Sequence, residues 1–459
     1  MQTGVSGLRA RGPIDFTQGN IVGSIVLFSI PIVLGELFQN LYNSVDALVV
    51  GNLVSDSALA AVSVCSMIAN LIVNFFNGVS VGSNVVVSHA FGEGDADELR
   101  RAVRVVFTFS TLLGVALSVL GIVFAPFLLD LTGALPEYYA EALTYLRIYL
   151  AGLMFTVIYN NGAGILRAIG NSATPFYILV ASCLTNIVLD LVLVAVFHLG
   201  VAGVGLATVF SQFFSVACVY RTINRSLSIR CIDLRETRYH GRRIIFSAMD
   251  IGMAAGLQSA LIALSNMFIV RYMNLFDTAA VAGIGIAQRL DRFIILPTKS
   301  VGMTMTTYVS QNLGAKRYDR VREGARKCAV LALCVTLSLC AVVYIFSEEC
   351  VALFNQTPEV VSVGVAMMHV LVPFFWCMSL REVILGILRG YKLTKAPMVL
   401  SVLGMVVMRQ IFLAVAMGHD RNIFYIYVCY PVAWFATLLM NAVYYLWMRK
   451  RLPGLGAEG

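Results

Sequence analysis

Long apolar segments constrain this chain more than any other feature. Runs of apolar residues recur from one end to the other, and about 20 such residues in an α-helix cross the hydrocarbon core of a bilayer. Hydrophobic residues make up 59% of the chain and charged residues 13%, against about 25% charged residues in a soluble domain. Twelve membrane-spanning helices are predicted, over residues 21–50, 58–86, 103–128, 139–166, 174–197, 201–220, 244–272, 279–309, 327–347, 361–388, 396–417 and 422–448.

The second half of the chain repeats the first at a fixed offset of 222 residues. Residues 164–167 (Gly-Ile-Leu-Arg) recur at 386–389, and the same shift relates residues 87–104 to 309–326. Because two distant stretches share one offset, a whole half is duplicated. Six spans separate equivalent points, so the halves have parallel orientation and a two-fold axis along the membrane normal. This arrangement favours a transporter.

Arginine and lysine residues alternate with the predicted spans. They gather at the termini and in every second loop, whereas the alternate loops hold only Arg271 and Arg421. The positive-inside rule then places both termini in the cytoplasm, so topology rather than nucleic acid explains the net charge of +8. The first span is too long for the core of a signal peptide. We expect a multi-pass protein of the inner (cytoplasmic) membrane of a prokaryote.

Three parts of the chain are predicted from these patterns. Residues 1–220 form an N-lobe with spans 1–6, residues 221–243 a cytoplasmic basic linker, and residues 244–459 a C-lobe with spans 7–12. The linker either sets the topology or has a regulatory or lipid-binding role. The ten cysteines include no CxxC pair, so packing is favoured over disulfides or metal ligands.

Two carboxylates lie inside predicted spans of the N-terminal half, Asp46 and Asp190. Ionisable groups at that depth are costly and usually functional. Asn186 shares a helix face with Asp190, and Thr208 lies about 10 Å into the sixth span. Two acids in a low-dielectric pocket raise each other's proton affinity, and oxygen ligands suit sodium. The pattern favours a coupling site for a proton or sodium ion, with a neutral hydrogen-bonded brace as the alternative.

The C-terminal half lacks an aspartate at the equivalent positions and carries other ionisable residues within its spans: Arg289, Asp291, Arg292, Lys299, Arg381, Glu382 and Arg409. They form either local charge pairs or a basic wall facing a substrate. Methionine and aromatic residues of the spans either line an adaptable cleft or simply pack. The candidate substrate-contacting residues are Tyr42, Met67, Gln258, Met303, Trp376, Arg289 and Arg409.

Several segments resemble the multidrug and toxic compound extrusion (MATE) transporters. They are residues 31–51 with Asn40-Leu41-Tyr42-Asn43-Ser44-Val45-Asp46, the paired Gly-Ile-Leu-Arg segments, the paired loops after spans two and eight, and residues 311–315 (Gln-Asn-Leu-Gly-Ala). The resemblance covers nearly the whole chain. It implies two six-helix lobes around a V-shaped cleft, and export of organic, often cationic and aromatic compounds by proton or sodium antiport.

The resemblance also implies roles for particular residues. In the DinF-like branch an aspartate of span one works with residues of spans five and six, and the matches here are Asp46, Asn186, Asp190 and Thr208. In the NorM-like branch span seven carries a glutamate, where this chain offers Gln258, and Glu382 is out of register with the aspartate of span ten. The DinF-like branch is therefore the better assignment.

We expect an all-α integral membrane protein that works as a cation-coupled antiporter for amphipathic or cationic organic compounds. It would act as a monomer in contact with membrane lipid and small organic substrates, without nucleic acid and without a cofactor beyond the coupling ion. The first alternative is a flippase or exporter of an anionic lipid-linked or amphiphilic substrate. A major facilitator transporter ranks lower, because residues 89–94 (His-Ala-Phe-Gly-Glu-Gly) replace its usual loop after span two. A passive channel remains open, and a membrane enzyme is disfavoured because the five histidines are scattered.

Overall fold

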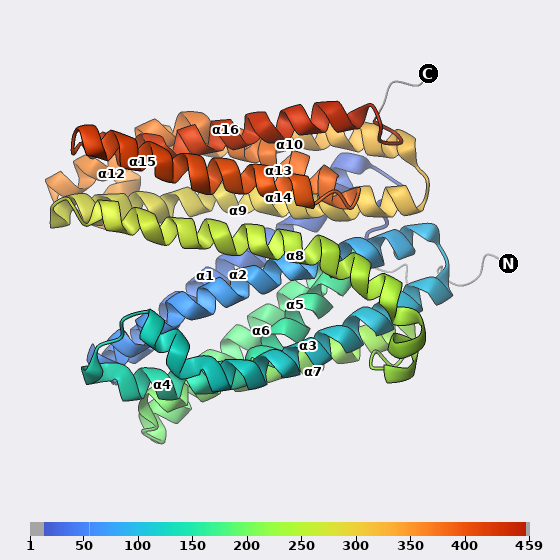
Figure 1. Ribbon diagram of the computed structural model, residues 1–459, viewed down its shortest axis with the longest axis horizontal. Coiled ribbons are helices and arrows are strands. Elements are labelled where there is room, and N and C mark those ends of the chain that lie inside the picture. The colour runs from blue at the N-terminus through green and yellow to red at the C-terminus, as the bar shows by residue number, and fades with distance from the viewer. Residues whose placement is uncertain (1–12, 55, 456–459) are drawn as a thin grey trace. The chain divides into compact units, whose positions relative to one another are not determined.

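The computed structural model describes residues 13–54 and 56–455, without the side chains of residues 41–50, 52, 53, 56 and 240. In this part of the chain every regular element is a helix (Figure 1). The elements are α1 (Ile21–Leu53), α2 (Asp56–Glu93), α3 (Ala96–Leu131), α4 (Pro136–Ala151), α5 (Leu153–Ala168), α6 (Ala173–Asp190), η2 (Leu191–Val196), α7 (Gly200–Leu227), α8 (Leu234–Met273), α9 (Thr278–Gly314), α10 (Tyr318–Ile345), α11 (Ser347–Ala352), α12 (Pro358–Leu371), η3 (Val372–Phe374), α13 (Phe375–Gly390), α14 (Lys395–Val402), η4 (Leu403–Met408), α15 (Arg409–His419) and α16 (Phe424–Arg449).

Most of these helices are long and apolar enough to cross a membrane. Within the described residues ten helical spans qualify, or eleven when α4 and α5, which meet at a bend of 42°, count as one. The 37-residue helix α9 is also long enough, but its interior carries four ionisable residues. With α9 included, the described residues contain twelve helical spans, the number predicted from the apolar segments.

The duplication extends to the backbone conformation at the ends of helices. After α5 the chain turns through Gly170 (φ 87°), and after α13 it turns through Lys392 (φ 63°), which is 222 residues later. In both turns the next residue's N–H donates to a carbonyl five residues back, at 2.9 Å, as in a Schellman motif. The turns after α2 and α9 match at the same offset, with positive φ at Gly94 and Lys316. The repeat is therefore structural as well as sequential.

The chain divides into two compact units. Unit 1 contains residues 13–15 and Ile30–Gly256, and unit 2 contains Phe16–Ser29 and residues 257–455. Both α1 and α8 therefore contribute to each unit, whereas the predicted lobes assigned each span to one lobe. The predicted linker is mostly helical, because only residues 228–233 separate α7 from α8.

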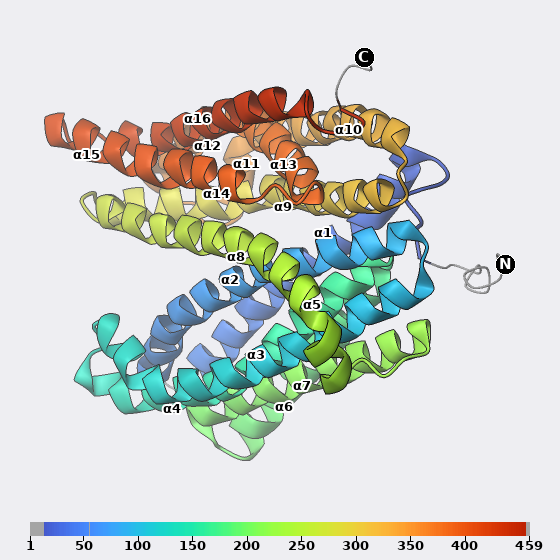
Figure 2. The ribbon, with the colours of Figure 1, turned by 45° about the vertical axis from the view of Figure 1, so that its right-hand side comes forward.

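Glycines explain why the first half of α8 belongs to unit 1. Gly78 and Gly82 on α2 face Gly252 and Gly256 on α8, where the two helices cross (Figure 2). A Cβ added to Gly252 would lie 2.6 Å from the carbonyl oxygen of Val79. Small residues four apart allow two helix backbones to approach this closely in a membrane. Sequence analysis did not recognise this pair of motifs.

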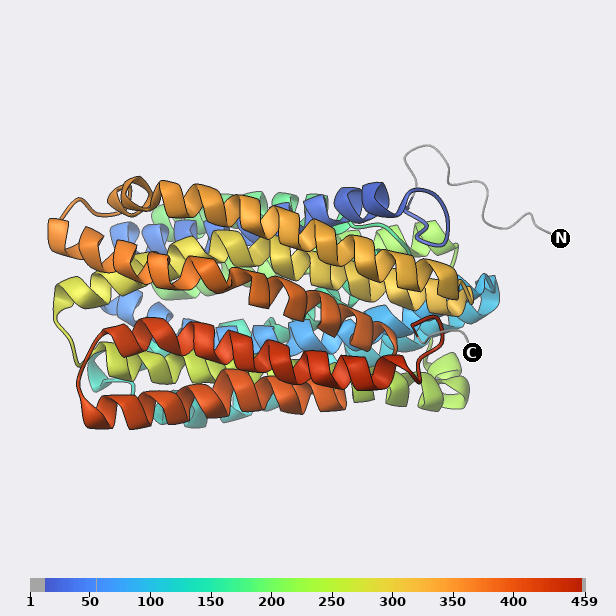
Figure 3. The ribbon, with the colours of Figure 1, turned by 90° about the horizontal axis from the view of Figure 1, so that it is seen from above.

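Unit 2 is built around α9, which packs against α10, α12 and α13. The segment before α1 joins this unit because the N–H of Phe16 donates to Oε1 of Gln311 at 3.1 Å. The hydroxyls of Ser29 and Thr304 lie 2.7 Å apart. Helices α15 and α16 run antiparallel and side by side (Figure 3). The buried apolar residues of unit 2 form one core, in which other helices pack against several sides of α9.

Candidate functional site

The predicted coupling residues with described side chains are buried in unit 1. Asp190 and Asn186 on α6 are 0% exposed, and Thr208 on α7 is 7% exposed. Asp190 is the last residue of α6, and the π-helix η2 begins directly after it. Such π-turns inside a span are rare and occur frequently at functional sites. Asp190 is therefore a buried carboxylate next to a break in the α-helical hydrogen-bond pattern.

One hydrogen bond fixes the register between α6 and α7. The hydroxyl of Ser182 donates to the carbonyl of Ser211 at 2.7 Å. The two helices are antiparallel neighbours, so each turn towards the C-terminus of α6 lies opposite a turn nearer the N-terminus of α7. Asn186, one turn after Ser182, therefore lies level with Thr208, and Asp190 lies one turn beyond Asn186. This register places Asn186, Asp190 and Thr208, all buried, along the contact between α6 and α7, which we call the seam.

One predicted coupling residue, Asp46, and one predicted cleft residue, Tyr42, lie on α1. The backbone of α1 includes positions 42 and 46, but the side chains of Tyr42 and Asp46 lie outside the described residues. The meeting of Asp46 with Asp190 therefore stays a prediction.

The seam is suited to binding a small cation. An ionised acid at the centre of a membrane helix costs about 2.5–3.5 kcal/mol on insertion scales. A proton removes that cost by neutralising the carboxylate, and a sodium ion does so by accepting oxygen ligands from carboxylate, amide and hydroxyl groups. Asp190, Asn186 and Thr208 supply these three oxygen types.

A different polar network occupies unit 2. Arg409 follows the π-helix η4 and is 1% exposed. Its Nη2 donates to Ser265 Oγ at 2.7 Å and to Asn266 Oδ1 at 2.9 Å. Its guanidinium lies 5.6 Å from the ring centroid of Tyr430, whose hydroxyl accepts from Gln288 at 2.9 Å. The network joins α8, α9, α15 and α16, and no periodicity in the sequence indicated it.

The other ionisable residues of the unit 2 spans behave in two ways. Arg381 and Glu382 are both buried and form an ion pair at 2.8 Å, which confirms the predicted local pairing. Asp291 is also buried, but no lysine or arginine nitrogen within the described residues lies in salt-bridge range of it. Arg289, Arg292 and Lys299 are exposed on α9.

The remaining cleft candidates lie on four helices. Met67 on α2 is 44% exposed, and Met303 on α9 is half-buried. Gln258 on α8 is buried. Trp376 on α13 packs against the apolar core of unit 2, which favours the packing interpretation for that residue.

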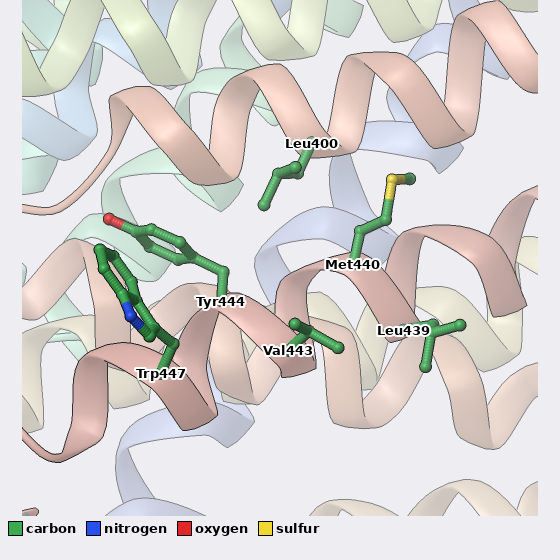
Figure 4. Close-up of a pocket in the computed structure, with 6 residues that line it drawn as sticks. All are labelled: Leu400, Leu439, Met440, Val443, Tyr444 and Trp447. Atoms are coloured by element: carbon green, nitrogen blue, oxygen red, sulfur yellow. The ribbon is translucent and has the colours of Figure 1, made fainter.

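An apolar groove lies elsewhere, between α14 and α16 (Figure 4). Its lining residues are Leu400, Leu439, Met440, Val443, Tyr444 and Trp447. None of the predicted site residues lines it. Its lining is apolar and carries no charged side chain that could bind a coupling ion.

The fold and these sites define a multi-pass membrane protein with a duplicated helical unit and ionisable residues buried in both copies, as in secondary transporters. The chain belongs to the MatE family, whose sequence signature matches residues 31–192 and again residues 254–415. The starts of the two matches, 31 and 254, differ by 223 residues, within one residue of the offset found in the sequence. The resemblance and the duplication are thus confirmed.

Similar proteins of known name agree with this assignment. The "Probable multidrug resistance protein YpnP" of Bacillus subtilis (strain 168) is 29% identical, over 87% of this chain and 89% of that protein. The "Probable multidrug resistance protein YoeA" of the same organism is 26% identical, over 94% and 95%. A solved structure, described as an outward-facing conformation of a multidrug resistance MATE family transporter of the MOP superfamily, matches with a TM-score of 0.87 and 20% identity, over 97% and 99%. That likeness establishes the fold, and these proteins are named as resistance proteins and a transporter, not as enzymes.

Proposed function

We propose that this protein is a cation-coupled antiporter that exports amphipathic organic compounds by alternating access. The observation that carries the proposal is the complete burial of Asp190 at the junction of α6 and η2, along one seam with Asn186 and Thr208. The family and the names of YpnP and YoeA support an organic substrate. The proposed place of action is the cytoplasmic membrane of a prokaryote, with both termini in the cytoplasm and one chain as the working unit.

In the proposed cycle, a proton or sodium ion enters from outside and neutralises Asp190, with Asp46 as its proposed partner. Asn186 and Thr208 orient the acid and supply further oxygens. Neutralisation removes the cost of an ionised group in the spans, so the seam closes around the cation while the substrate leaves outward. Release of the cation to the cytoplasm restores the charged acid and the inward-open state. The coupling ion is a transported species, and no other cofactor is required.

The test is transport by purified protein in liposomes. A pH gradient and a sodium gradient are imposed separately, and uptake of rhodamine 123 and of fluorescein is followed in parallel. We expect one gradient to drive one of the dyes, and Asp190→Asn to reduce the driven rate at least about tenfold, because a neutral amide cannot cycle its charge. Asp46→Asn is expected to behave in the same way.

Asp420→Asn is the matched control, because it makes the same chemical change at an exposed position beyond the end of α15. It should leave gradient-driven transport unchanged. If Asp190→Asn transports as fast as the wild type under both gradients, the seam is a structural brace and the coupling proposal is wrong.

A further inference from the structure

Three cations share one side of α9. Arg289, Arg292 and Lys299 are all exposed, and at about 100° of rotation per residue they fall within about 80° of arc. We call these three residues the α9 cation face. The midpoint of α9 is Leu296, so at about 1.5 Å per residue all three lie within about 10 Å of the middle of the helix. Charges that set topology lie instead near the ends of spans.

The far side of α9 contacts other helices of unit 2. Gly302 approaches the carbonyl of Glu382 on α13, Gly283 approaches α12, and Thr298 approaches Thr336 of α10. These contacts lie about 120–220° around the helix from Arg289. Asp291, the carboxylate within α9, is buried about 160° around the helix from Arg289, about 100° from Arg292 and about 80° from Lys299. Arg289 therefore lies on the opposite side of the helix from this acid, and within the described residues none of the three cations forms a salt bridge with it.

Exposure of the α9 cation face to the hydrocarbon of lipid would be energetically costly. Ionisable side chains at bilayer depth face the interior of a bundle or a water-filled cavity. Leu296 lies between the cations and is buried, as expected if the aliphatic stems of Arg292 and Lys299 extend over it. The charged groups at the ends of those stems then face water. Phe293 is 54% exposed at the edge of the same face and offers apolar surface beside the charges.

The internal repeat supplies a comparison within the same chain. Subtracting 222 from the positions of the cation face gives Met67, Asn70 and Asn77 on α2, and all three are exposed. The same face is therefore open in both copies, but it is neutral in unit 1 and carries three positive charges in unit 2. Since α2 forms a long helix with neutral residues there, the equivalent helix of the repeat forms in unit 1 without charges at these positions.

We propose that the α9 cation face binds the anionic group of the transported compound, a carboxylate, sulfonate or phosphate on an amphiphile. Guanidinium groups bind such groups through paired hydrogen bonds, and the apolar part of the amphiphile would lie against Phe293 and Met303. This inference rests on the proposed function. It narrows the amphipathic substrates to anionic ones, in place of the cationic compounds that the family resemblance implied.

The test is equilibrium binding to purified protein in detergent, without any gradient. Fluorescein and rhodamine 123 share a ring system but differ in charge, and their binding is measured by fluorescence anisotropy. We expect fluorescein to bind at least about tenfold more tightly, and to weaken as salt rises from about 0.05 to 0.5 M, because charge attraction is screened. Replacing the cations by their repeat counterparts, as Arg289→Met, Arg292→Asn and Lys299→Asn together, should weaken fluorescein binding at least about tenfold.

Two control variants test whether a loss of fluorescein binding is specific to the α9 cation face. Arg326→Gln removes one exposed charge near the start of α10 and should leave fluorescein binding unchanged. Arg292→Lys keeps the charge and should retain most of the binding, which a loss of folding would not allow. Gel filtration and thermal unfolding establish whether the triple variant is folded. If it is not, the single variant Lys299→Asn replaces it and should weaken fluorescein binding by a smaller factor.

The inference is overturned if folded wild-type protein binds rhodamine 123 as tightly as fluorescein, fails to bind fluorescein, or binds it equally well after neutralisation of the face. Competition with phosphatidylglycerol and phosphatidylcholine separates two sources of the anion. Displacement by phosphatidylglycerol alone assigns the face to a lipid headgroup, and no displacement assigns it to a soluble amphiphile. Because no gradient is used, these outcomes leave the coupling proposal to its own transport assay.

Discussion

The crossing of α2 and α8 leads to a prediction whose size follows from the structure. In Gly252→Ala the new Cβ would lie 2.6 Å from the carbonyl oxygen and 3.1 Å from Cα of Val79. Carbon atoms in proteins normally approach to about 3.5–4.0 Å. Because the atoms in the way are backbone, no change of rotamer relieves the overlap, and the two helices must move apart by on the order of 1 Å.

The expected cost combines two opposing effects. Overpacking a close contact costs about 1–3 kcal/mol, and a backbone overlap belongs near the upper value. Alanine gains about 1 kcal/mol over glycine in a helix. The net loss is therefore about 2 kcal/mol, and since about 1 kcal/mol shifts the melting temperature of a unit this size by about 2–4 °C, Gly252→Ala should melt about 4–8 °C below the wild type.

The assay is thermal unfolding of the purified protein in one detergent, alongside Gly285→Ala as a matched control. Gly285 is also inside a long helix, but a Cβ added there meets no atom within 4 Å. Only the gain in helix propensity applies, so its melting temperature should stay unchanged or rise by about 2–4 °C. If the two variants melt at the same temperature, the close approach of α2 and α8 does not exist in the purified protein.

Two further predictions concern a buried ion pair and a buried thiol. Arg381→Leu leaves the Glu382 carboxylate without its partner and should lower the free energy of unfolding by about 3–5 kcal/mol, whereas adding Glu382→Leu should recover most of that loss; equal denaturation midpoints for the single and double variants would argue against the pair. Burial raises the pKa of Cys231, in the connection between α7 and α8, from 9.0 to about 12, so below pH 9 its thiol should resist maleimide until the protein unfolds, as read by mass spectrometry of its peptide. Because the unfolded thiol ionises first, its contribution to stability is complete below about pH 9 and is lost as the pH rises towards 12; rapid native labelling at pH 8 would contradict this.

Much of the fold follows from the order of residues alone. The apolar runs predicted the number of crossings because a bilayer of fixed thickness requires helices of fixed length. The matching turns of the two halves also follow from local sequence. The shared Gly-Ile-Leu-Arg segments end in turns with the same hydrogen bonds, because the residues that close each Schellman motif are neighbours in the chain. Asp190 and Asn186 could be selected for the same reason, because a spacing of four on one helix places both on one face.

The sequence alone could not show that one helix contributes to both units, or which face of a helix is left uncovered by its neighbours. Gly252 and Gly82 are 170 positions apart in the chain, and only the packed structure shows that their backbones meet. The charges at Arg289, Arg292 and Lys299 were visible as letters, but whether they pair locally or face water depends on which neighbours cover α9. Helix length and periodicity are set by nearest neighbours in the chain, whereas burial is set by contacts between residues far apart in the chain. The sequence therefore determined the membrane-spanning helices and their duplication. The tertiary structure decided which residues form the buried seam and which form the exposed cation face.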